Sequence, residues 1–162
     1  MTMFATILVP TDFSECSRRA VETGLEVAAR FDARRLVLVH ASAHIDHGSF
    51  VDPEVLRTVD QVLEREQERL ASMAREQMDS LLAQGEAAFP RDRVEYIIAS
   101  GNPVSLILTT ARDVAADLIV MGTHGRQGLS DHILGSTTER VQRRATCAVL
   151  TVKPDDFGFA EP

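Results

Sequence analysis

Five short, mostly apolar runs alternate with four amphipathic segments along this chain, and this alternation constrains its fold more than any other feature. The runs cover residues 5–9, 36–39, 94–99, 118–121 and 147–152. Near-continuous apolarity over such lengths is typical of strands that are buried on both faces of a sheet. Strands separated by helices predict a parallel sheet with helices on both faces. We therefore expect a single doubly wound α/β domain. Of the strand orders that such a domain allows, we expect 3-2-1-4-5, which would make the first strand a neighbour of the fourth.

Signals for helix initiation precede the amphipathic segments. Asp12 and Ser14 offer side-chain acceptors to the first, whose apolar positions keep helical spacing to about Arg30. Asp52-Pro53 and Asn102-Pro103 each combine an N-cap residue with a proline at the first helical position. These signals predict where the first three helices begin.

The second and fourth helices have less ordinary signals. The second helix would begin at Asp52-Pro53 and end at Gly85, which is unusually long. The charged run at 64–69 within it indicates either a solvated part of the helix that extends beyond the core or a break in the helix. In the fourth, Ser136 and Glu139 have the spacing of a capping box. We therefore expect Ser136 to cap the last helix, which should end near Ala145.

Length and charge exclude several classes of protein. A chain of 162 residues suits one domain, expected over residues 1–153, with a frayed tail at 154–162. The net charge of -7 argues against nucleic-acid binding and against binding to anionic membranes, because both require a basic face. No run approaches the ~20 apolar residues of a membrane span. The two cysteines, Cys16 and Cys147, are expected to be reduced thiols in a cytoplasmic protein.

Glycines cluster where the fourth strand gives way to the last helix. Met121-Gly122-Thr123-His124-Gly125-Arg126, here the glycine loop, directly follows the strand, and Gly135-Ser136-Thr137 opens the helix. A strand that leads through glycines into a helix N-terminus directs backbone amides toward a phosphate. The spacing differs from a dinucleotide fingerprint, and without a lysine in the loop it is not a P-loop. Each glycine taken alone is more often just a turn residue or a helix start, so the phosphate interpretation depends on the combination of three glycines, a hydroxyl residue and Arg126.

A second polar segment is expected beside the glycine loop. Pro10-Thr11-Asp12 follows the first strand, which the predicted order places next to the fourth. Ligands of doubly wound sheets lie beyond the carboxyl ends of the strands, where the strand order reverses. Together the two segments predict one nucleotide site.

The chain also resembles the universal stress protein family over residues 3–153. Three segments carry the likeness: Ile7 to Ser14, Leu38 to Ala41, and the glycine loop together with Leu134 to Glu139. The closing strand is similar as well. The pattern G-x2-G-x9-G-[ST] is the one associated with family members that bind ATP.

This resemblance implies a ligand, a set of site residues and a partner. The ligand would be ATP with Mg²⁺ or Mn²⁺ on its phosphates, and the partner a second copy of the chain, paired through the fifth strand. The implied site residues are Pro10, Thr11, Asp12, Ala41, Met121, Gly122, His124, Gly125, Arg126, Gly135, Ser136 and Thr137. Ala148 stands where the family usually has proline, and the acidic Asp131 where a basic residue is frequent; an acid near phosphates would weaken binding.

These observations favour an ATP-binding regulator of the stress response. Two other functions remain open: a slow ATP hydrolase or phosphotransferase using Asp12, His124 and Arg126, and a ligand-free dimeric interaction module. No catalytic residue is assigned, because efficient phosphoryl transfer needs more metal ligands and charge clamps than these.

Histidines also gather after the second strand. His40, His44 and His47 have the spacing H-x3-H-x2-H. This spacing matches no established zinc pattern, so we predict no metal site there and read the segment from Ser42 to Asp52 as a polar surface loop.

Overall fold

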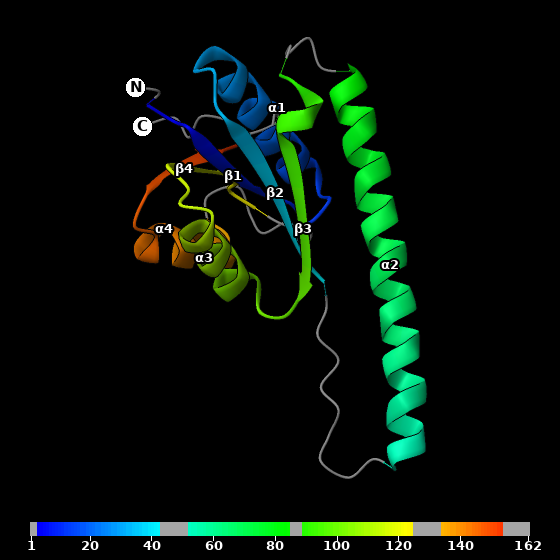
Figure 1. Cartoon of the computed structure of the whole chain (residues 1–162). Helices are drawn as coiled ribbons and strands as arrows, with labels where there is room; N and C mark the ends of the chain where they lie inside the picture. Colours follow the sequence, from blue (N-terminus) through cyan, green and yellow to red (C-terminus); the bar gives the residue numbers. More distant parts are fainter. Residues whose placement is uncertain (1–2, 43–51, 85–88, 125–133, 154–162) are drawn as a thin grey trace.

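A computed structural model describes residues 3–42, 52–84, 89–124 and 134–153. Five parallel strands form one sheet in the order β3-β2-β1-β4-β5, which confirms the predicted order (Figure 1). Their bounds are β1 Thr6–Pro10, β2 Arg35–Ser42, β3 Val94–Ser100, β4 Leu118–Gly122 and β5 Ala148–Val152. The strands that sequence periodicity located are therefore all present.

Four α-helices accompany the sheet: α1 Glu15–Arg30, α2 Pro53–Gln84, α3 Pro103–Asp113 and α4 Ser136–Arg144. The core is divided by the sheet into two layers. On one face, Ile7 and Val9 of β1 pack with Ala20 and Leu25 of α1. On the other face, Leu8 of β1 packs in a cluster that includes residues of α3 and α4. Adjacent β1 residues thus enter opposite layers, which explains why the strand is apolar throughout.

Helix α2 is continuous over 32 residues, so the charged run is not a break. Its residues Glu66 and Arg69 form an ion pair with 2.7 Å between Nη2 and Oε1. The helix runs alongside β3 and extends well past the end of that strand (Figure 1). It ends at Gln84; Gly85 and the tail at 154–162 lie outside the described residues. No helix in the described segments is long and apolar enough to cross a membrane.

The predicted caps are confirmed at three of the four helices. Ser14 caps α1 by accepting from the amide of Ser17, and Asn102 caps α3 by accepting from the amide of Ser105 at 3.2 Å. At the start of α2, Asp52 accepts from the amide of Glu54 at 2.8 Å. Short polar side chains before each helix therefore act as their residue types predict.

The capping box at Ser136 was a wrong prediction. The N-cap of α4 is Gly135, Ser136 is the first residue inside the helix, and no side chain of the described residues caps it. The amide of Gly135 donates to the carbonyl oxygen of Thr123 at 2.7 Å, and the Gly135 carbonyl accepts the first helical bond from Glu139. The contact with the glycine loop fixes Gly135, and this shifts the cap one residue earlier.

Candidate functional site

Strands β1 and β4 separate at their carboxyl ends, where the strand order reverses. Their ladder ends at the pair Leu8–Ile119, although each strand continues for two or more residues. The amide of Thr11 bonds the carbonyl of Val39 in β2, whereas the amide of Thr123 bonds the carbonyl of Val152 in β5, each at 2.9 Å. The two loops after β1 and β4 therefore diverge toward opposite neighbours, which is the geometry of a ligand site in such sheets.

The loop after β1 is held by its own side chains. The Thr11 hydroxyl accepts from the amide of Phe13 at 3.1 Å. The Asp12 carboxylate accepts from both the amide and the hydroxyl of Ser14, at 3.0 and 2.6 Å. Such side-chain bonds to the backbone are typical of turns before helices. They give the Asp12 carboxylate a defined orientation at the edge of the sheet.

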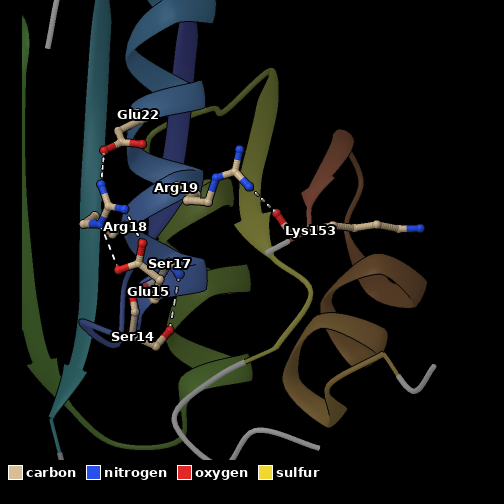
Figure 2. Close-up of polar contacts among 7 residues, drawn as sticks. All are labelled: Ser14, Glu15, Ser17, Arg18, Arg19, Glu22 and Lys153. Atoms are coloured by element: carbon tan, nitrogen blue, oxygen red, sulfur yellow. Dashed lines mark hydrogen bonds and ion pairs between the residues drawn. The ribbon is translucent and has the colours of Figure 1, made fainter. Parts of the chain in front are cut away.

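The first turn of α1 joins this loop to the end of β5 (Figure 2). Arg18 forms ion pairs with Glu15 and Glu22, and its hydrogen bond holds the pKa of the Glu15 carboxyl below its usual value. Arg19 Nη1 donates to the carbonyl oxygen of Lys153 at 3.3 Å. The Arg18 ion pairs lie within α1, whereas the Arg19 bond links this helix to the residue that follows β5.

Gly122, at the end of β4, is required by contacts within the chain. A Cβ built there would lie 2.8 Å from the Sγ of Cys16 and 3.1 Å from the Cys16 backbone. The Cys16 thiol is buried and donates to the carbonyl of Val152 at 3.4 Å. This glycine therefore admits the first turn of α1 against β4, which the sequence did not indicate.

The N-terminus of α4 is fixed to the glycine loop. Beside the bond from Gly135 to Thr123, the hydroxyl of Thr138 donates to the carbonyl oxygen of Gly122 at 2.8 Å. A Cβ on Gly135 would approach the Thr123 carbonyl to 3.0 Å. The first amides of α4, including those of Ser136 and Thr137, thus have a fixed position without a side-chain cap. A helix N-terminus carries about half a positive charge and attracts anions.

His124 has an unsatisfied buried nitrogen. Its Nδ1 lies 2.9 Å from the Thr123 hydroxyl, but its Nε2 is buried and has no hydrogen-bond partner among the described residues. A buried polar group left unpaired costs about 1–3 kcal/mol. A ligand atom hydrogen-bonded to Nε2 would remove this cost.

The predicted site residues occupy one edge of the sheet, as far as they are described. Pro10, Thr11 and Asp12 follow or end β1, and Ala41 lies near the end of neighbouring β2. Met121 is buried in the core under α3 and α4, so its side chain is not exposed to a ligand. Gly125, Arg126 and Asp131 lie outside the described residues.

Of the three histidines in the H-x3-H-x2-H pattern, the structure describes only His40. His40 belongs to β2, is 6% exposed, and its Nδ1 donates to the carbonyl of Thr11 at 2.7 Å. His44 and His47 lie outside the described residues. Within the described segments, no group of three His, Cys, Asp or Glu residues could hold a metal ion.

Comparison with known proteins connects this geometry to a family. The model of the universal stress protein family matches residues 3–153. Universal stress protein MJ0531 of Methanocaldococcus jannaschii is 33% identical over 93% of this chain and 83% of that protein. The solved structure of MJ0577, from the same organism, is 28% identical, with a TM-score of 0.69 over 95% of this chain and 99% of that one. A universal stress protein solved in complex with cAMP is 28% identical, with a TM-score of 0.62 over 92% and 96% of the two chains.

Proposed function

Because this chain belongs to the universal stress protein family, we propose that it binds an adenine nucleotide, with ATP preferred, where β1 and β4 separate. The nucleotide sets the conformation or the partners of the protein, which acts as a regulator in the stress response. The observation that carries this proposal is the N-terminus of α4, which is fixed to the glycine loop and is not capped by any side chain of the described residues. Within the same described segments, the Nε2 of His124 in that loop has no hydrogen-bond partner. The relative in complex with cAMP supports an adenine ligand.

Each of the two loops binds a different half of the nucleotide in this proposal. We assign the phosphates to the amides of Ser136 and Thr137 at the N-terminus of α4 and to the Nε2 of His124, which has no hydrogen-bond partner among the described residues. Thr11 and Asp12 receive the ribose or the adenine, and the backbone of Ala41 flanks the base. Gly125 and Arg126 complete the phosphate side in this proposal.

A divalent cation, Mg²⁺ or Mn²⁺, accompanies the phosphates. The net charge of the chain is -7, and Arg126 is the one basic side chain that we assign to the phosphates, so a bound triphosphate would keep much of its negative charge without a cation. Because no cluster of three potential ligands occurs in the described segments, the cation is held mainly by the phosphates. The proposal is tested by mass analysis of nucleotide released from gently purified protein: an adenine nucleotide supports it.

We expect ATP turnover far below the roughly 1–100 s⁻¹ of protein kinases. The Asp12 carboxylate already accepts from Ser14, and efficient phosphoryl transfer needs more metal ligands and charge clamps than Asp12, His124 and Arg126 supply. Single-turnover hydrolysis of labelled ATP measures this. Turnover in the kinase range would make the protein an enzyme.

We also propose a homodimer paired through β5. This strand ends the sheet, so its outer backbone groups have no strand partner in the described part of the chain, and Leu150 is 39% exposed. An apolar edge strand favours pairing with another chain. Ala148, in the place of a proline, retains an amide donor for such pairing.

Leu150→Asp is expected to dissociate this dimer at micromolar concentration, because each pairing would place two carboxylates in an apolar contact. Sedimentation velocity measures the change. Val62→Asp, on α2, is a matched control because Val62 is 58% exposed. A wild-type monomer, or equal dissociation of both variants, contradicts pairing through β5.

A further inference from the structure

Phe13 has a left-handed backbone conformation, with a φ of 64°. For a bulky residue this conformation costs about 1–3 kcal/mol and persists only where neighbouring contacts enforce it. Its amide donates to the Thr11 hydroxyl at 3.1 Å. Its ring lies against the ring of His40, with 4.4 Å between the centroids. The loop after β1 is therefore held in a strained shape, and His40 is one of the groups that hold it.

His40 makes a second contact with the same loop. Its Nδ1 lies 2.7 Å from the carbonyl oxygen of Thr11, and because a carbonyl oxygen only accepts, Nδ1 carries the proton. One buried ring thus contacts Thr11 and Phe13, the two neighbours of Asp12 in the chain. The contacts come from β2, one residue before Ala41.

We propose that His40 is a positioning residue for the adenosine half of the site. Through its Nδ1–H and its ring it fixes Thr11 and Phe13, and thereby the direction of the Asp12 carboxylate, relative to the backbone of Ala41. This inference rests on the proposed function. It assigns to His40 a role beyond that of a buried histidine whose hydrogen bond only stabilises the fold. A core histidine affects stability alone, whereas a positioning residue also changes affinity for adenosine.

Two amide variants separate these roles. In His40→Asn the side-chain NH₂ group occupies about the position of the histidine Nδ1 and can donate to the Thr11 carbonyl. In His40→Gln the NH₂ group is one bond farther from the backbone, near the position of Nε2, and is displaced from that carbonyl. Both variants lose the ring, so their difference reports the donor to Thr11. We expect His40→Asn to bind more tightly than His40→Gln by about tenfold, the factor of roughly one net hydrogen bond. The ratio should be equal for adenosine and ATP, because the effect acts on the adenosine half.

Isothermal titration of wild type and both variants with adenosine and ATP gives these ratios. In parallel, denaturant unfolding without ligand measures the stability of each protein, and hydrogen exchange of the Phe13 amide measures how firmly the loop is held. Faster amide exchange at Phe13 in His40→Gln than in His40→Asn would show that His40 holds the loop, whether or not the protein binds nucleotide. If wild type binds no nucleotide, both the proposed function and the binding role of His40 are wrong. If wild type binds but the two variants have equal affinities, or differ only in proportion to their stability, the positioning role is wrong and the proposed function stands.

Discussion

A Gly122→Ala variant is expected to unfold about 1–3 kcal/mol more easily than wild type and to lose nucleotide affinity. The added Cβ would lie 2.8 Å from the Sγ of Cys16 and 3.1 Å from its backbone. An overlap of this size in a packed region forces backbone or side-chain shifts. Because Gly122 ends β4 at the proposed site, the shift would also displace the glycine loop. Urea unfolding and ATP titration measure the two effects.

Two companion variants isolate the cause. Cys16→Ala in the Gly122→Ala background removes the Sγ contact but not the backbone contact, so it should restore part of the lost stability. Gly24→Ala is the matched control, because its Cβ would lie 2.7 Å from Val9 Cγ2 in the core under α1. It should lose stability while folded protein keeps its ATP affinity. If the effects of the Gly122 and Cys16 changes on the free energy of unfolding are additive, the contact between the added Cβ and the Cys16 Sγ is not the cause of the lost stability.

The second large effect is expected from Thr138→Val. This change keeps the shape of the buried side chain but removes the hydroxyl that donates to the Gly122 carbonyl at 2.8 Å. We expect a stability loss of about 1–2 kcal/mol. We also expect about tenfold weaker ATP binding, since the N-terminus of α4 would no longer be fixed beside the glycine loop.

The choice of ligand tests whether Thr138 acts on the phosphate half. Adenosine affinity should remain nearly unchanged in Thr138→Val, because adenosine carries no phosphate for α4 to receive. Thr138→Ser, which keeps the hydroxyl, should retain ATP affinity. Equal losses for adenosine and ATP would place the phosphates elsewhere or make the effect one of general stability.

Local sequence patterns were sufficient for the fold. Apolar runs such as residues 118–121 are typical of strands that are buried on both faces of a parallel sheet, and the N-caps Ser14 and Asn102 depend on residues at most three positions away. The match of these signals to the observed elements follows from their short range.

The site was predicted less completely, because its contacts are long-range. The sequence suggested that glycines of the motif leave room for phosphates, but the close neighbours of Gly122 and Gly135 are Cys16 and the Thr123 carbonyl. The capping box failed for the same reason, since Ser136 and Glu139 alone cannot indicate that Gly135 bonds Thr123.

The residues that were missed share this property. Cys16, Phe13 and His40 act on parts of the chain that local spacing does not connect, and the left-handed conformation of Phe13 is unusual for its residue type. Phe13 and His40 lie in segments that carry the family resemblance, but local spacing indicates neither their contact with each other nor the bond from His40 to Thr11. The general position that we propose for the site, by contrast, follows from the predicted strand order together with the glycine loop and the segment after the first strand.

Binding of an adenine nucleotide by the divergent loops after β1 and β4 can be measured by equilibrium dialysis. Nucleotide-stripped protein is dialysed against labelled ATP, with wild type and Thr138→Val run together. We expect saturable, stoichiometric binding to wild type that adenosine displaces, and weaker ATP binding to the variant. The absence of saturable ATP binding to folded wild-type protein would contradict the proposed function.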